Sequence, residues 1–317
     1  MPTTTNQELT APLALNGGGF TMLALDQRES LRRMFPLVDG AEVGDDQLRS
    51  FKKEAVRTLT PHASAVLLDR PYAVEADRPA EIADGCALIL AVDVLDQPPG
   101  QGVIASSLDP VATVEFIHHV GAAAIKLLVI WRPGPSRDER TALIREFVDL
   151  AAEAGVASLL EGIAKPQEGD VWATDDDRQN GILDAAADMA DSGATIYKGE
   201  VPGYAPGDTS LVREHAERMT RQLPMPWVVL SNGTDAKDFA AATREACLGG
   251  ASGFLAGRAI WADTVADADP AEALRTRSTE RLRALADIVS TAGAEYGGGK
   301  ETVSFAGSDK GAEDGPR

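Results

Sequence analysis

Eight short apolar runs, repeated along the chain, constrain the fold more than any other feature of the sequence. They are continuous rather than alternating, as expected of parallel strands that are covered on both faces. The intervals between them are long enough for a crossover helix. Eight such units in a row predict an α/β fold, a closed (β/α)8 TIM barrel in a single domain. The runs occupy residues 20–26, 63–69, 87–93, 123–131, 157–163, 195–201, 226–232 and 253–259.

Helix signals lie between these runs. The segment 109–120 begins with Asp109 as an expected N-cap and Pro110 at the first helical position, and the segment that ends at Gly155 carries a C-cap signal. No GxGxxG motif follows the first run, which disfavours a dinucleotide-binding fold. The expected helices cover residues 109–120, 136–155, 178–193, 235–250 and 269–293.

Composition limits the partners and the compartment. The net charge of −19 disfavours nucleic acid and anionic lipid, and no apolar run is long enough to span a membrane. The N-terminus resembles no signal peptide, and we expect Cys86 and Cys247 to be core residues, so a cytoplasmic protein is expected. We expect three parts along the chain: a flexible N-terminal extension at 1–16, the barrel at 17–294 and a disordered tail at 295–317.

Two lysines lie within predicted strands, where an ammonium must be desolvated. Lys198 stands in TIYKGEV and Lys126 in AAIKLLVIW. Either amine could reach the barrel mouth or pair with a carboxylate. Two neighbouring cations lower each other's pKa, which would make a lysine nucleophilic at neutral pH.

Carboxylates complete this set at the carboxyl ends of the strands, where barrel enzymes carry their active sites. Asp26 ends the first run, Glu161 lies late in the fifth, and Glu200 shares a strand face with Lys198. Imine formation and carbon–carbon bond cleavage need an amine together with acid–base groups. Asp69 and Asp93 also end runs, but we interpret them as helix caps or loop ligands.

Small residues and an arginine follow the last two strands. Ser231, Asn232 and Gly233 follow the seventh run, and Gly257 and Arg258 close the eighth. Exposed backbone N–H groups and a guanidinium at this position favour phosphate binding. No zinc-like cluster is present, and His62, His118, His119 and His215 are interpreted as structural or solvated, so we expect no metal and no cofactor.

These motifs resemble the class I aldolases of the bacterial tagatose-1,6-bisphosphate aldolase family, over about residues 17–292. They are FTMLALDQRES, AIKLLVIWR, YKGEVP, PWVVLSNGTD and GASGFLAGRAIW. The resemblance implies Lys198 as the Schiff-base lysine, Glu161 as the acid–base, and Lys126 and Asp26 as partners at the keto carbon. It also implies an anion site at Ser231, Gly257 and Arg258, and a cytoplasmic homo-oligomer. The chain has Gly162 where the family has proline after this glutamate, which we expect to loosen the following loop.

The resemblance is greatest to the sulfosugar-cleaving members. It therefore implies retro-aldol cleavage of 6-deoxy-6-sulfofructose 1-phosphate to dihydroxyacetone phosphate and sulfolactaldehyde. Tagatose 1,6-bisphosphate and fructose 1,6-bisphosphate remain possible substrates, and a transaldol reaction or a non-enzymatic sugar-phosphate-binding barrel remain possible functions. Such a ketose phosphate needs a second anion site, for which the available donors are Gln27, Arg28, Arg70 and Arg132.

Overall fold

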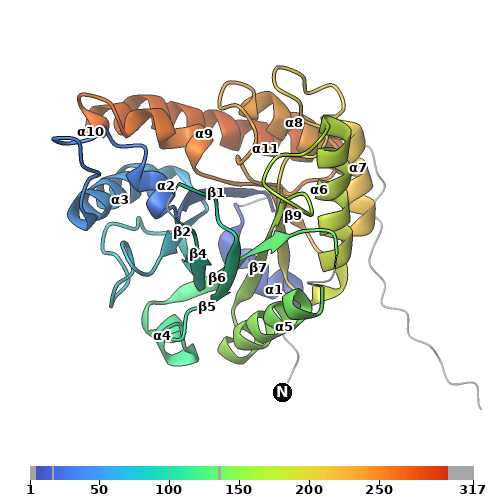
Figure 1. The fold of residues 1–317 in the computed structure, drawn as a ribbon, viewed down its shortest axis with the longest axis horizontal. Helices are drawn as coiled ribbons and strands as arrows, with labels where there is room; N and C mark the ends of the chain where they lie inside the picture. The colour runs from blue at the N-terminus through green and yellow to red at the C-terminus, as the bar shows by residue number, and fades with distance from the viewer. Residues whose placement is uncertain (1–4, 16–17, 99, 135–136, 299–317) are drawn as a thin grey trace, which may run out of the picture.

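Eight parallel strands close into the barrel that the sequence predicts (Figure 1). The computed structural model describes residues 5–298 apart from 16–17, 99 and 135–136. The strands follow the order β1-β10-β9-β8-β7-β6-β3-β2 around the barrel. Each expected run overlaps one of them: β1 (Phe20–Leu25), β2 (Ala65–Asp69), β3 (Ala87–Ala91), β6 (Ala122–Trp131), β7 (Ala157–Ala164), β8 (Ile196–Gly199), β9 (Trp227–Val229) and β10 (Gly253–Ala256).

Helices surround the barrel. The longer ones are α3 (Asp45–Leu59), α4 (Val114–His119), α5 (Arg137–Ala154), α6 (Asp175–Met189), α7 (Val212–Gln222), α8 (Phe239–Leu248) and α11 (Thr279–Gly298). The short ones are α1 (Asn6–Thr10), α2 (Glu29–Arg32), α9 (Arg258–Trp261) and α10 (Pro270–Ala273). Short 3-10 turns occupy 11–13, 60–62, 190–192 and 262–264, and a π-helical turn at 274–278 joins α10 to α11. No helix in the described part of the chain is long and apolar enough to span a membrane.

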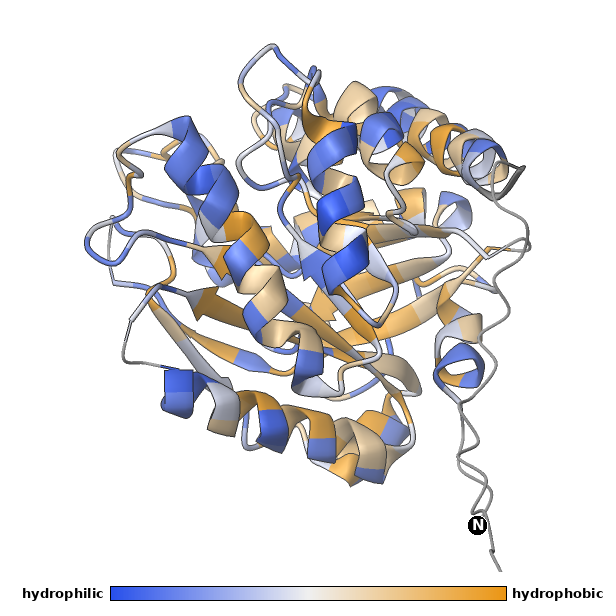
Figure 2. Cartoon of the chain, turned by 90° about the vertical axis from the view of Figure 1, so that its right-hand side faces the viewer, coloured by the Kyte–Doolittle hydropathy of each residue, from blue (hydrophilic) through white to orange (hydrophobic). Residues whose placement is uncertain are grey.

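Two apolar layers hold the barrel together. The inner layer fills the barrel with side chains such as Met22, Leu159 and Leu255. The outer layer lies between the strands and the helices and includes Phe147 and Trp227. Figure 2 shows the corresponding pattern, with apolar strands inside and hydrophilic residues on the outer sides of the helices. Alternate residues of each strand therefore face the barrel interior.

Three helices begin at other residues than expected: α8 begins at Phe239 rather than at 235, and α4 and α6 also differ. The first turn of 109–120 is not helical, because the Asp109 carboxylate pairs with Arg70 and accepts the Val111 N–H. Helix α4 instead begins after Thr113, whose hydroxyl accepts the Phe116 N–H. Helix α6 starts at Asp175, three residues before the expected position, because Thr174 caps it. Short polar side chains before α4 and α6 supplied the stronger N-caps.

A two-stranded antiparallel hairpin interrupts the alternation of strands and helices. It consists of β4 (Asp93–Asp96) and β5 (Ala105–Leu108) and lies between β3 and β6 in the chain. No pattern identified in the sequence predicts this hairpin, and it ends the expected third strand at Ala91. The hairpin region places Leu95, Gln97, Gly102 and Val103 at one side of the barrel mouth.

The expected boundaries of the barrel also shift. Part of the expected N-terminal extension is folded: it forms α1, and Leu13 is fully buried among the inner apolar side chains. At the other end α11 continues to Gly298, past the expected boundary at residue 294. Residues 1–4 and 299–317 lie outside the described residues.

Candidate active site

The two strand lysines both point into the barrel. Lys126 comes from β6 and Lys198 from β8, and their side chains are 1% and 4% exposed. An apolar residue two positions earlier on each strand, Ala124 or Ile196, fills the inner layer below the amine. The amines are therefore held at the upper end of a dry core, where an ammonium needs an ionic partner.

Glu161 on β7 lies between the two lysines and contacts both. Its Oε2 is 2.7 Å from Lys126 Nζ and 3.0 Å from Lys198 Nζ. The strand register explains this arrangement, because Glu161 and Lys198 are direct neighbours across β7 and β8. One buried carboxylate thus sits within proton-transfer distance of both amines.

Lys126 is held by two further carboxylates. Its Nζ lies 2.8 Å from Asp26 Oδ2 and 3.0 Å from Asp93 Oδ2. Burial by itself would lower the pKa of Lys126, but Asp26, Asp93 and Glu161 outweigh burial and raise this pKa well above its ordinary value. The expectation that the lysine pair lowers the pKa of Lys126 is therefore wrong, since three anions surround this amine.

Asp26 shows the reciprocal effect. Burial by itself would raise the pKa of Asp26, but Lys126 and Lys198 hold it well below its usual value. The Asp26 carboxylate is therefore ionised beside the lysines, as a charge partner rather than a proton donor.

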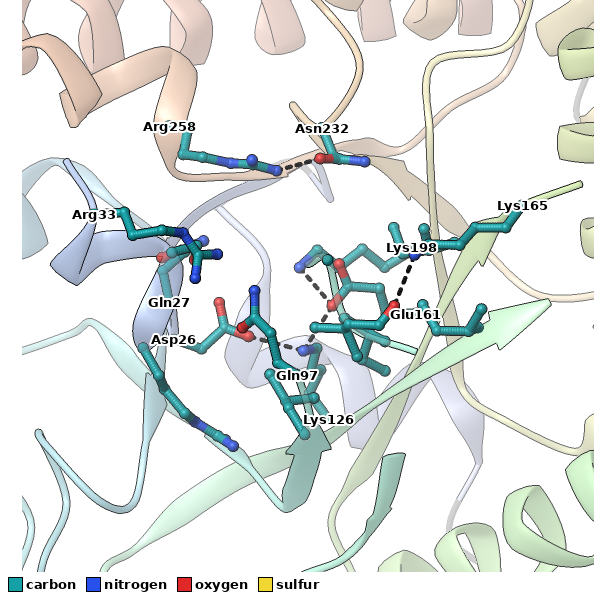
Figure 3. A pocket seen from close by; sticks show the side chains of 18 residues that line it. Asp26, Gln27, Arg33, Gln97, Lys126, Glu161, Lys165, Lys198, Asn232 and Arg258 are labelled. Atoms are coloured by element: carbon teal, nitrogen blue, oxygen red, sulfur yellow. Dashed lines mark hydrogen bonds and ion pairs between the residues drawn. The ribbon is translucent and has the colours of Figure 1, made fainter. Parts of the chain in front are cut away.

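These groups line a cavity of about 280 Å³ at the barrel mouth (Figure 3). It contains eight of the expected site residues: Asp26, Gln27, Arg28, Lys126, Glu161, Lys198, Asn232 and Arg258. The structure therefore brings the first, fourth, fifth, sixth, seventh and eighth expected strands together at one site.

Of the expected anion-binding residues, Asn232 and Arg258 line the cavity, and Ser231 and Gly257 directly precede them in the chain. Arg258 begins α9, and its guanidinium donates to the side-chain oxygen of Asn232. The Ser231 hydroxyl accepts the Ala259 N–H at 3.5 Å. A Cβ at Gly257 would lie only 2.3 Å from Ala24 O, so a side chain there is sterically excluded.

Glu200 and Gly233, also expected at the site, lie outside the cavity. Glu200 is buried, and it accepts the Ala164 N–H at 3.0 Å and pairs with Arg178 at 3.2 Å. Burial raises the pKa of Glu200, although Arg178 opposes this shift. Gly233 lies beside this pair with a φ of 73°, and a Cβ there would meet Arg178. These residues support the loops around the site.

The arginines expected to supply a second anion site all form ion pairs with carboxylates of the protein. Arg132 donates to the carbonyl oxygens of Pro166 and Gly169 and pairs with Asp170 at 3.0 Å, outside the cavity. Arg70 pairs with Asp109. Arg28 does line the cavity, but it also pairs with Asp93 at 2.9 Å.

Comparison with known proteins places this architecture in a family. Residues 20–263 match the family model described as "DeoC/LacD family aldolase". The chain belongs to the DeoC/LacD family of aldolases. This confirms the expected enzyme class, a carbon–carbon lyase that acts as an aldolase.

Relatives with assigned names align with this aldolase over most of its length. It is 25% identical to "Tagatose 1,6-diphosphate aldolase 2" of Enterococcus faecalis, over 90% of this chain and 93% of that one. It is 26% identical to a "Tagatose 1,6-diphosphate aldolase" of Listeria monocytogenes, over 86% and 88%. An archaeal fructose 1,6-bisphosphate aldolase shares the fold, with a TM-score of 0.63 and 16% identity over 90% of this chain and 100% of that one.

Sequence reasoning missed several residues that line the site of this aldolase. Arg33 follows α2, and Gln97 and Val103 belong to the hairpin region. Lys165 follows β7 and donates to Val103 O at 2.8 Å, which joins the hairpin to the next loop. A lysine directly after the fifth expected run was the one visible signal; the hairpin residues carried none.

Gly162 has a structural role in β7. A Cβ at this position would lie 2.4 Å from the Tyr197 hydroxyl. Tyr197 is buried on β8, and its ring also lies against Gly199. The expected loosening of a loop is therefore wrong, because Gly162 lies inside the strand and Tyr197 fills the space above it.

Proposed function

We propose that this aldolase cleaves its substrate through a Schiff base on Lys198. The observation that carries the proposal is the ion pair between Lys198 and Glu161 in a buried cavity at the carboxyl end of the barrel. A buried amine next to a carboxylate supplies both the nucleophile and the group that moves its protons.

The residues allow a balanced reaction. Lys198 Nζ, once it passes a proton to Glu161, attacks the C2 keto carbon, and Glu161 returns protons as the carbinolamine loses water to form the iminium ion. The carboxylate then takes the proton of the C4 hydroxyl while the C3–C4 bond breaks, and the electron pair of that bond enters the enamine. An aldehyde leaves, C3 is protonated, and water releases dihydroxyacetone phosphate from Lys198. Asp26 and Lys126, which form an ion pair, hold a negative and a positive charge in fixed positions beside C2 during these steps.

The substrate that we propose is 6-deoxy-6-sulfofructose 1-phosphate, which yields dihydroxyacetone phosphate and sulfolactaldehyde. The C1 phosphate would bind at Arg258 and the backbone beside Ser231 and Gly257, and Asn232 would orient the guanidinium. The C6 anion would then reach the opposite side of the mouth at Arg28, whose guanidinium pairs with Asp93 of the hairpin.

The charge of that opposite side supports a sulfonate. Arg28 is paired with Asp93, and Lys165 with Asp170 at 2.8 Å. A sulfonate carries one negative charge, whereas a phosphate carries about −1.5 to −2 at pH 7. Arg28 and Lys165 are thus neutralised by neighbouring carboxylates, whereas Arg33 has no carboxylate partner among the described residues. The neutralisation of two cations of the cavity favours the anion of lower charge.

The names of the relatives favour a different substrate, tagatose 1,6-bisphosphate, with fructose 1,6-bisphosphate as its epimer. The deciding experiment measures kcat/KM for the sulfonate and for both bisphosphates at one ionic strength. We expect the sulfonate to be preferred. A tenfold preference for a bisphosphate, about 1.4 kcal/mol of transition-state binding, would contradict our choice and leave the aldolase mechanism intact.

The same assay tests a transaldol reaction and a purely binding role. Cleavage to two trioses without an added acceptor excludes an obligatory transaldol reaction, and turnover of any kind excludes a barrel that only binds sugar phosphates.

We also propose that the protein is a cytoplasmic homo-oligomer. Its cysteines Cys86 and Cys247 are free and buried, which is in line with a reducing compartment. Light scattering after size-exclusion chromatography tests the assembly.

A further inference from the structure

Asp93 is buried between two cations of the site without lining the cavity itself. Its carboxylate is 1% exposed and uses both oxygens. Oδ1 accepts from Arg28 Nη2 at 2.9 Å, and Oδ2 accepts from Lys126 Nζ and from the Leu128 N–H, each at 3.0 Å. The sequence favours Asp93 as a helix cap or loop ligand, but in the structure it is the first residue of β4 and binds two cations.

The two cations differ in what they face. Lys126 belongs to the buried cluster with Asp26 and Glu161. Arg28 lies at the mouth of the cavity, and its Nε is buried without a hydrogen-bond partner in the described chain. A buried N–H without a partner is costly, so this donor indicates a ligand that completes it.

We propose that Asp93 is a positioning residue that fixes Arg28 for the C6 anion and Lys126 for the acid–base cluster. The inference rests on the proposed function, because it requires a substrate with an anion at C6. Two hydrogen bonds from charged donors to one rigid carboxylate determine where both cations point. Loss of the negative charge at residue 93 should therefore have two separate effects. Displacement of Arg28 should reduce discrimination between substrates, and displacement of Lys126 should slow the chemical steps.

The test compares the wild-type enzyme with Asp93→Asn on 6-deoxy-6-sulfofructose 1-phosphate, fructose 1,6-bisphosphate and fructose 1-phosphate. Asparagine keeps the size of the side chain and an acceptor for the Leu128 N–H. We expect the preference in kcat/KM for the better C6-anionic substrate over fructose 1-phosphate to fall about tenfold, as a misplaced charged donor predicts. The remaining loss, through Lys126, should appear in kcat on fructose 1-phosphate with little change in KM.

A double-mutant cycle with Arg28→Gln shows whether the effect passes through Arg28. The double variant should discriminate no worse than Arg28→Gln alone. Asp96→Asn is the matched control, because Asp96 is exposed on the same hairpin strand and should keep the wild-type ratio.

The outcomes separate this inference from the proposed function. An equal loss on all three substrates, with the preference intact, assigns Asp93 a purely structural role and overturns the inference. If Asp93→Asn does not fold, an unchanged preference in Arg28→Gln overturns it and a reduced one supports it. A wild-type enzyme that cleaves fructose 1-phosphate as well as both C6-anionic substrates contradicts the proposed function first, and the Arg28 half of the inference with it.

Discussion

Lys198 Nζ and Glu161 Oε2 lie 3.0 Å apart, on neighbouring strands whose register pairs these two residues directly. The contact depends on backbone geometry rather than on flexible loops, since both residues belong to strands that are buried along their length. Such a rigid arrangement keeps the amine and the acid–base group in reacting position before substrate arrives.

Lys198 should carry the covalent intermediate. Borohydride reduction in the presence of dihydroxyacetone phosphate should add one triose irreversibly, and peptide mapping should locate it on Lys198. Lys198→Met should abolish both the adduct and the activity. An adduct on Lys126 would reverse the roles that we assign, and activity without any adduct would exclude the Schiff-base route.

Glu161→Gln should lose turnover while it still traps substrate. The change keeps the shape of the side chain but removes proton transfer, an effect of about 10²–10⁴-fold in rate. Glu168→Gln, in the exposed loop after β7, is the control and should behave as wild type. Near-normal turnover of Glu161→Gln would shift the acid–base role to Asp26, the other carboxylate that lines the cavity.

Lys126→Met should destabilise the fold as well as impair catalysis. It leaves Asp26, Asp93 and Glu161 without their shared cation, and removal of one partner of a buried ion pair costs about 3–5 kcal/mol. Urea unfolding measures the loss. Lys53→Met removes an exposed ion pair with Glu81 and should change the free energy of unfolding by less than about 1 kcal/mol. Equal effects of the two substitutions would show that the cluster adds no stability.

The stability that the cluster contributes should depend on pH in a defined direction. The folded pKa of Asp26 is lowered from 3.8, so its contribution is present above pH 3.8 and is lost as the pH falls toward the folded value. The pKa of Lys126 is raised from 10.5, so its contribution is complete below pH 10.5 and is lost only at higher pH. The difference in Tm between wild type and Lys126→Met should therefore be constant from about pH 5 to 9 and shrink below pH 3.8. A difference that grows in acid would contradict these directions.

Chelation should leave the activity intact. The carboxylates of Asp26, Asp93 and Glu161 surround the Lys126 ammonium, and within the described residues no group of three metal-ligating side chains is arranged for a metal ion. The enzyme dialysed against EDTA should keep its full kcat/KM. Loss of activity that zinc restores would move the reaction to the metal-dependent class of aldolases.

Much of the architecture follows from local sequence patterns. Apolar runs covered on both faces identify the barrel strands, and a lysine or glutamate within such a run can only point into the mouth or disrupt the core. Lys126, Glu161 and Lys198 are therefore identifiable as site residues from the sequence alone. The register that brings Glu161 between the lysines depends on how the strands close, which no local pattern contains.

The misassigned residues depend on long-range pairing. The hairpin strand that begins at Asp93 resembles the end of the preceding run, so its carboxylate was interpreted as a cap. Arg132 directly follows a strand, yet carbonyl oxygens of a distant loop hold it away from the cavity. Arg33 follows a helix rather than a strand and carried no signal.

The Tyr197 side chain on β8 packs into the space beside Gly162 on the neighbouring strand β7. The phenol occupies the space that a side chain at 162 would need, so Gly162 cannot change while Tyr197 is present. Any β-carbon introduced at 162 requires a smaller residue at 197, and both sites adjoin the reacting pair, Glu161 by one peptide bond and Lys198 by another. A side chain at 162 therefore needs a second substitution at 197, and a variant that changes 162 alone should misplace the catalytic pair while its cavity keeps every polar group.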